Sequence, residues 1–299
     1  MSGDAPARVI CAGHVNWDVT LSVDRLPGAD GEATITDQSQ SCGGSASNAA
    51  TGLAALGNDG IVLGSVGDDE NGHLATRALD SAGVDCDPLV VADTETAVKY
   101  LVVDPDGEVA VLGNEVGNEA FGAEDLDADT LAAADHLHLT SQAPDTAAEL
   151  ADRAHDHGLR VSFDPGRRID ARDFTAPLAR ADLVFVNERE AATAIEDHFG
   201  PADGLDKTVV LKHGAAGAEV LTPCGHYASH DGFPVEAVDT TGAGDAFAAG
   251  FLTAWLDGDG DPDFDRCLAV ANACGALAAG ERGPSAPLSW DRIEDLLDA

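Results

Sequence analysis

Short apolar runs alternate along this chain with longer amphipathic stretches, and this alternation constrains the fold more than any other feature. The runs have the length and apolar content of strands that are buried on both faces. They are residues 9–14, 61–66, 136–140, 160–164, 182–187 and 208–212. Helices are expected between them, including residues 46–56, 72–82, 145–157 and 188–198. Strand and helix in turn predict an α/β fold, a doubly wound and mainly parallel sheet with helices on both faces.

The size and composition of the chain fit one large folded unit. Its 299 residues are 44% hydrophobic, and no repeat or Pro/Ser-rich linker divides them. We therefore expect a single domain over residues 1–299. No apolar run approaches the ~18 residues of a membrane span. The N-terminal MSGDAPARVI also lacks the layout of a signal peptide. We expect a cytoplasmic protein with no membrane partner.

The balance of charge is strongly acidic. Asp and Glu number 54 against 16 Lys and Arg, which gives a formal net charge of −38. Such a chain repels itself in dilute buffer, whereas at molar salt the Debye length falls to about 3 Å. This composition favours a halophilic source; the alternative is an acidic protein from an ordinary cytoplasm. Nucleic acid is not an expected partner, because no basic stripe is present to neutralise phosphates.

The cysteines give no sign of a metal site or a disulfide framework. They show no C-x-x-C spacing and no neighbouring histidine cluster, so we expect small buried apolar residues. The six are Cys11, Cys42, Cys86, Cys224, Cys267 and Cys274.

Two segments do not fit a buried parallel sheet. Residues 15–23 alternate strictly between apolar and polar, and residues 97–103 and 108–112 flank a turn sequence, Asp-Pro-Asp-Gly. We expect a small second sheet with one polar face, with lid strands near residues 15–41 and 97–113. A lid over a polar ligand and an ordinary solvated sheet edge both fit this pattern.

A glycine turn followed by a carboxylate is the strongest chemical signal. Gly242, Ala243 and Gly244 precede Asp245, and residues 247–255 continue as the apolar stripe of a buried helix. The first turn of a helix offers unpaired N–H groups that bind anions. A carboxylate in that turn is suited to taking a proton from a hydroxyl group that attacks a phosphate. An ordinary helix N-terminus with an acidic first turn would have the same sequence pattern.

Two stretches far apart in the chain resemble signatures of one enzyme family. VDTTGAGDAFAAGF at residues 238–251 resembles the C-terminal signature of the ribokinase-like (PfkB) carbohydrate kinases. GGSASNAA at residues 43–50, with LAALG after it, resembles the family's N-terminal signature at the sugar site. The likeness extends from Gly13 to Ser285. It implies a ribokinase-like fold with a small β-sheet lid, and an ATP-dependent carbohydrate kinase that uses Mg²⁺.

The resemblance implies a role for each matching residue. Asp245 is the expected catalytic base, and the backbone amides of Gly242, Ala243 and Gly244 are the expected anion hole. Residues 187–190 resemble the family's N-x-x-E motif, which positions magnesium and phosphates, although a helix-capping role explains the same pair. The expected nucleotide-site residues are Asn187, Glu190 (through water to Mg²⁺), Lys212, Gly214, Gly217 and Asn272.

The acceptor and a monovalent cation have their own expected residues. Asn16 and Asp18 share the polar face of the first lid strand, where two acceptors could bind neighbouring hydroxyl groups. Gly43, Gly44 and Asn48 are expected to approach from the next motif. Ribokinases of the family have glutamate where this chain has Gln142, which argues against plain ribose. The resemblance also implies a potassium site, which Asp239, Thr241 and Gly283 match loosely.

Cations near the expected site indicate the charge of the acceptor. Lys99 lies in the middle of a lid strand, and Arg167 and Arg168 follow the strand at residues 160–164. Cations gathered in so acidic a chain favour an anionic acceptor such as ribose 1-phosphate, a fructose phosphate or 2-keto-3-deoxygluconate. Lys99 paired with a nearby acid is the simpler alternative. A nucleoside kinase and a non-catalytic ligand-sensing homologue are the other candidates, and a homodimer through the lid is expected.

Overall fold

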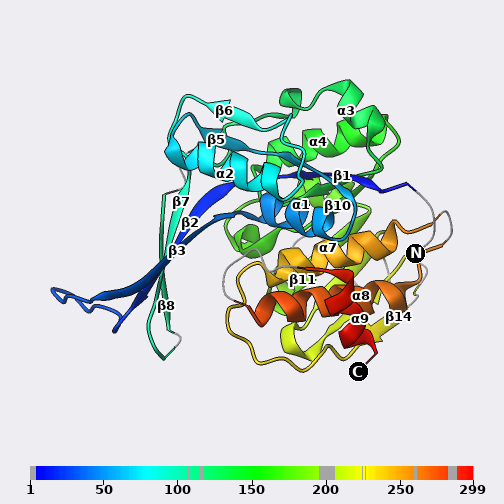
Figure 1. Ribbon diagram of the computed structural model, residues 1–299. Coiled ribbons are helices and arrows are strands. Elements are labelled where there is room, and N and C mark those ends of the chain that lie inside the picture. The colour runs from blue at the N-terminus through cyan, green and yellow to red at the C-terminus, as the bar shows by residue number, and fades with distance from the viewer. Residues whose placement is uncertain are drawn as a thin grey trace.

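The computed structural model describes residues 5–106, 108–114, 117–194, 206–223, 225, 227–258, 261–281 and 288–298. An eight-stranded sheet forms its centre (Figure 1). From β4 to β12 all neighbouring strands run parallel, and β13 and β14 close one edge antiparallel. In spatial order the strands are β14 (Tyr227–His230), β13 (Ala218–Leu221), β12 (Thr208–Lys212), β11 (Leu183–Asn187), β10 (Arg160–Phe163), β9 (His136–Leu139), β1 (Arg8–Ala12) and β4 (Asp59–Leu63).

Two apolar cores, one on each face of the sheet, explain why its strands are so apolar. Along β1 the side chains of Val9 and Cys11 enter one core, and those of Ile10 and Ala12 enter the other. The first core is covered by α1 (Ser45–Ala55), α2 (Glu70–Ser81), α7 (Ala243–Trp255), α8 (Phe264–Ala279) and α9 (Trp290–Leu297). The second is covered by α3 (Ala128–Ala133), α4 (Pro144–Asp156), α5 (Thr175–Arg180) and α6 (Glu188–Ala194). The predicted α/β class is confirmed.

The predicted strands and helices agree with the structure to within a few residues, with two differences. The run at residues 61–66 divides, because the chain leaves the sheet at Gly64, where a side chain would lie 2.6 Å from the Gly13 carbonyl oxygen. It continues as β5 (Ser65–Gly67), which pairs with β6 (Val90–Ala92). Residues 195–198 of one predicted helix lie outside the described part of the chain.

The second sheet forms as predicted and stands to one side of the large one (Figure 1). Its order is β3 (Ile35–Gly43), β2 (Asn16–Val23), β7 (Val98–Val103) and β8 (Val109–Gly113). Asp18 of β2 is the register partner of Lys99 in the parallel neighbour β7. Paired residues of adjacent strands point to the same face, so both side chains lie on one face of this lid sheet.

Within the described residues, no helix combines the length and the apolar content that crossing a membrane requires.

Candidate active site

Asp245 lies in the first turn of α7, and Asn48, in the first turn of α1, donates a hydrogen bond from Nδ2 to its carboxylate at 2.8 Å. The two residues meet because α1 and α7 pack closely through small side chains. At Gly52 of α1 an added Cβ would lie 2.8 Å from the Cβ of Ala249. The glycine and alanine content of both motifs is therefore what brings the amide to the carboxylate.

The environment of Asp245 raises the pKa of its carboxyl group toward neutral pH. Burial is the main reason that its pKa is raised, to about 6, and the nearby carboxylate of Asp164 adds to the increase. The hydrogen bond from Asn48 and the charge of Lys212 act in the opposite direction. A base with a pKa near the working pH is present as carboxylate and still binds a proton well.

The start of α7 combines amides with a cation. Gly242 is the N-cap residue, and its φ of 76° lies in the left-handed region that favours glycine. The amide of Ala243 donates to the Thr240 carbonyl at 3.3 Å, so the turn itself uses this N–H. The amides of the first turn have no acceptor within the helix. A Cβ on Gly244 would lie 3.7 Å from Lys212 Nζ, which puts the ammonium group beside these amides.

Lys212 joins the glycine turn to a carboxylate that the motif analysis did not single out. Its Nζ lies 2.7 Å from Asp164 Oδ2, and the two side chains are 15% and 13% exposed. Burial alone would lower the pKa of Lys212. The surrounding carboxylates, Asp164 first, outweigh burial and raise the pKa. The position of Asp164 at the end of the strand at residues 160–164 was the signal that could have identified it.

Asn187 and Glu190 form a reciprocal helix cap. The Asn187 amide donates to Glu190 Oε2 at 2.9 Å, and the Glu190 amide donates to Asn187 Oδ1 at 2.9 Å. The structure therefore shows the capping interaction. It also holds a buried carboxylate near Asp164, because burial and then Asp164 raise the pKa of Glu190 while Lys212 lowers it.

These oxygens fit the demands of Mg²⁺ in part. Asp164 and Glu190 repel each other, which a divalent cation nearby would relieve. In the described residues no group of three or more His, Cys, Asp or Glu side chains could hold a metal on its own. That donor set suits an ion that keeps several waters, as Mg²⁺ does, better than an all-protein cage.

The motif at residues 43–50, called the acceptor motif below, packs against Asp18. A Cβ on Gly43 would lie 2.1 Å from Asp18 Oδ2, and one on Gly44 (φ 103°) would lie 2.2 Å from the His14 carbonyl oxygen. Asn16 and Asp18 are buried, and Asn16 Nδ2 donates to Asp18 Oδ1 at 3.1 Å. Burial raises the pKa of Asp18. The Asn16 Oδ1 atom is buried without a hydrogen-bond partner among the described residues, so it is available to a ligand.

A charged cluster adjoins this motif through His14. Glu119 accepts from His14 Nε2 at 2.8 Å and from both terminal nitrogens of Arg172 at 2.6 and 3.2 Å. Arg168 lies 3.8 Å from the same carboxylate. These contacts outweigh the effect of burial and lower the pKa of Glu119 to about 2. Arg167, the predicted binding residue, is exposed, and its neighbour Arg168 faces the cluster instead.

The remaining predicted residues belong to several different elements. Gly214 and Gly217 flank a 3-10 turn after β12 and have φ values of 60° and 92°. Asn272 is buried in α8 and donates to its own helix at the Leu268 carbonyl. Asp239 accepts from the Thr241 amide at 2.9 Å. The third predicted potassium residue, Gly283, lies outside the described residues.

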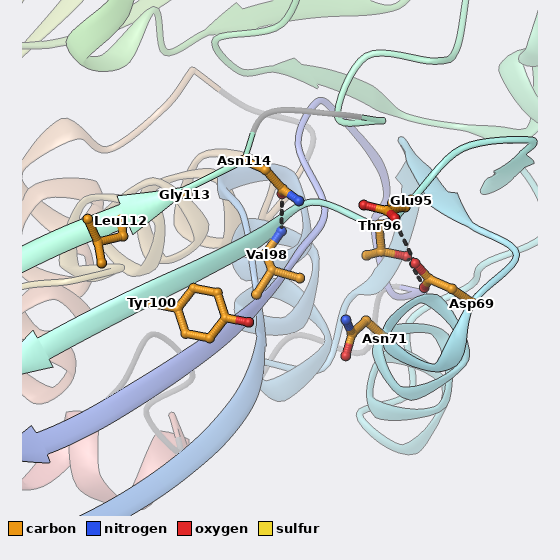
Figure 2. Close-up of a pocket in the computed structure, with 9 residues that line it drawn as sticks. All are labelled: Asp69, Asn71, Glu95, Thr96, Val98, Tyr100, Leu112, Gly113 and Asn114. Carbon is orange, nitrogen blue, oxygen red and sulfur yellow. Dashed lines mark hydrogen bonds between the residues drawn. The ribbon is translucent and has the colours of Figure 1, made fainter. Parts of the chain in front are cut away.

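A separate pocket of about 570 Å³ lies on the other face of the lid sheet. Figure 2 shows Tyr100, Val98 and Leu112 of the lid beside Asp69 and Asn71 at the start of α2. Side chains alternate along β7, so Lys99 points away from this pocket. The pocket is therefore separate from the face of the lid sheet that carries Asp18.

Comparison with known proteins identifies the family. The family model described as pfkB family carbohydrate kinase matches residues 6–291. The chain belongs to the pfkB family of carbohydrate kinases. The kinase is 58% identical, over 97% of its length and 98% of the relative, to an ATP-dependent ribose-1-phosphate kinase of Halopiger xanaduensis. It is 27% identical, over 92% of its length and 90% of the relative, to a nucleoside kinase of Methanothermobacter thermautotrophicus.

Solved structures confirm the ribokinase-like fold of this kinase. The ribokinase of Thermotoga maritima aligns with a TM-score of 0.85 at 22% identity and covers 98% of this chain and 100% of its own. The nucleoside kinase of Methanocaldococcus jannaschii aligns with a TM-score of 0.85 at 23% identity over 99% of each chain. The expectation of a carbohydrate kinase with this fold is confirmed.

The pH dependence of turnover tests the environment of Asp245. A base must be deprotonated, so kcat/KM should fall as the pH drops through about 6, rather than through 3.8, the ordinary pKa of aspartate. Replacing Asn48 with Ala removes the hydrogen bond that lowers this pKa. We expect the midpoint of the acidic limb to move to higher pH, measured as kcat/KM from pH 4.5 to 8. A midpoint that stays in place while KM rises would restrict Asn48 to acceptor binding.

Proposed function

We propose that this chain is an ATP-dependent ribose-1-phosphate kinase that phosphorylates the hydroxymethyl group of the sugar. The observation that carries the proposal is the meeting of Asp245, the first turn of α7 and Lys212 at one point beside the acceptor motif. A base, anion-binding amides and a cation are the groups that phosphoryl transfer needs. The relative with 58% identity, named for ribose 1-phosphate, supports the choice of acceptor.

Asp245 acts on the hydroxyl oxygen that attacks the terminal phosphate of ATP. The carboxylate takes the hydroxyl proton while the new oxygen–phosphorus bond forms and the bond to the leaving ADP breaks, so a sugar bisphosphate and ADP result. The amides at the start of α7 and the ammonium group of Lys212 receive the negative charge of the transferring group. Asn48 orients the base through its hydrogen bond.

The nucleotide belongs beyond β11 and β12, at the same edge of the sheet. Gly214 and Gly217 would allow the backbone to approach its phosphates, and Asn272 of α8 would lie near the base. Asn187, Glu190 and Asp164 would hold Mg²⁺ largely through water. The ion would neutralise charge on the nucleotide phosphates.

A nucleoside kinase is the second candidate, because a nucleoside kinase is among the relatives. Such an enzyme would be expected to stack the base on an aromatic side chain. The two candidates for that role near the lid, Trp17 and Phe121, are each 7% exposed and belong to the two apolar cores. The geometry therefore favours a sugar phosphate over a nucleoside.

Replacing Asp245 with Asn tests the catalytic step. The amide keeps the size and the contact with Asn48 but cannot accept the proton, so kcat should fall roughly 10²- to 10⁴-fold. The measurement is ADP release with ribose 1-phosphate, ribose, 2-keto-3-deoxygluconate and the common nucleosides, in molar KCl with Mg²⁺. ATP binding and thermal stability of the variant serve as controls. Turnover at the wild-type rate would contradict the proposed role, and a preference of the wild type for nucleosides would support the second candidate.

We also propose that a potassium ion binds beside the glycine turn. The amides of Val238 and Asp239 donate to the Ala279 carbonyl, and the Thr241 amide donates to Asp239. These bonds hold the segment before Gly242 in a fixed turn, as an adjacent cation site requires. Replacing KCl by LiCl at equal molarity should lower kcat several-fold, and the loss should be smaller after Asp239→Asn. Equal rates in the two salts would exclude this site.

A homodimer through the lid is proposed from the exposed apolar residues of that sheet. Side chains of this kind in a monomer commonly mark an interface. The most exposed are Ile35, Tyr100, Val109, Val111 and Leu112, at 54%, 44%, 51%, 58% and 62%. Val111→Glu should convert a dimer to a monomer in sedimentation velocity at molar KCl, with Val91→Glu, a similarly exposed site outside the lid, as the control. A wild-type protein that sediments at the monomer mass of 30.5 kDa would refute the dimer.

A further inference from the structure

A second group of polar residues surrounds His14, which lies between β1 and the lid strand β2. His14 follows β1, Gln142 follows β9, and Arg168 follows β10, so these three residues lie at the carboxyl edge of neighbouring strands. Lys99 reaches the same region from the lid, since its charge lowers the pKa of both His14 and Asp18. Donors and cations from both sheets therefore meet here.

Two of these groups have donors that the protein does not use. Gln142 is fully buried, and its Oε1 accepts from the Thr140 amide at 3.0 Å, which fixes the orientation of the side-chain amide. Its Nε2 has no hydrogen-bond partner among the described residues. A buried donor left unsatisfied costs about 1–3 kcal/mol, so a ligand group that accepts from it is favoured.

Lys99 is the second such group. Its side chain lies on the face of the lid that carries Asp18, and within the described part of the chain it forms no hydrogen bond or ion pair. Its register partner Asp18 carries a carboxylate on the same face, but burial raises the pKa of Asp18 and Asn16 already occupies one of its oxygens. The ammonium group is therefore available to an anion in the cleft.

We propose that Lys99 and Gln142, with Arg168, form the binding site, called the seat below, for the phosphate group that the acceptor already carries. Arg168 is directed into this region by Glu119, which Arg172 and His14 hold in place. The acceptor then spans the cleft, with its hydroxymethyl group at Asp245 and its phosphate at the opposite end. This inference rests on the proposed function, because it assigns the specificity of the same site.

The side-chain amide of Gln142 makes the seat compatible with a phosphate group, because its Nε2 is a free donor. An amide nitrogen donates to a phosphate oxygen, whereas a carboxylate at the same position would repel it. Because Lys99 belongs to the lid and Gln142 to the large sheet, a phosphate bound to both would also draw the lid toward the sheet. Selection of the acceptor and covering of the site would then depend on the same contacts.

The test compares acceptors that differ by one phosphate. Lys99→Met and Gln142→Glu are assayed with ribose 1-phosphate and with ribose, and the affinities of both sugars are measured by calorimetry without nucleotide. We expect the ratio of kcat/KM for ribose 1-phosphate to that for ribose to fall roughly tenfold to a hundredfold in each variant, and the ratio of affinities to fall likewise. Arg77→Met, which removes an exposed cation from α2, should leave both ratios unchanged.

The possible results separate the seat from the proposed function. If wild-type enzyme prefers ribose 1-phosphate and neither variant changes the ratios, the seat is refuted while the function stands. If the wild type prefers 2-keto-3-deoxygluconate instead, the proposed acceptor is wrong. The same variants, assayed with that sugar acid, then decide whether the seat binds its carboxylate. Equal losses for ribose and ribose 1-phosphate would also refute the seat, because they indicate a general defect in the cleft.

Discussion

One ammonium group lies among carboxylates at the centre of this kinase, and the arrangement of the active site depends on that balance. Lys212 contacts Asp164 directly, and its charge also lowers the pKa of Glu190 and Asp245. Without the cation these carboxylates would repel one another in a region of low water content. With it, Asp245 keeps a pKa of about 6 instead of a higher one, and so remains ionised at neutral pH.

The second constraint is the close packing of two helices whose facing residues are small. Gly52 lets α1 approach Ala249 of α7, and farther along the same pair Asn58 donates to Thr253. A larger side chain at the contact would separate the helices and with them Asn48 and Asp245. The acceptor motif and the catalytic motif, far apart in the chain, are thus parts of one packed unit.

The sequence was sufficient for the fold and for the position of the helix start at the glycine turn, because both are encoded locally. Apolar runs identified the parallel strands, and the glycine turn identified the start of α7. Contacts between motifs were harder to predict, because they depend on how strands are ordered in the sheet. Asp164 follows a strand and belongs to no motif, and Glu119 lies in a loop. The ion pairs that they form with Lys212 and Arg172 were therefore not predicted from the sequence. Arg167 is exposed whereas Arg168 lies beside Glu119, since successive side chains of a 3-10 turn differ in direction by about 120°.

The scarcity of lysine gives each of the three a meaning that it would not have in an average protein. Lys207 is buried and donates to the Leu178 carbonyl, so it stabilises the fold. Lys212 is paired with Asp164 beside the glycine turn at the start of α7. Lys99 has neither kind of partner within the described residues, although the surface of so acidic a chain carries many carboxylates. At molar salt, screening removes long-range attraction to that surface but leaves contacts at hydrogen-bond distance in a cleft largely intact. The position of Lys99 is best explained by an anionic group on the substrate, which the lysine would bind.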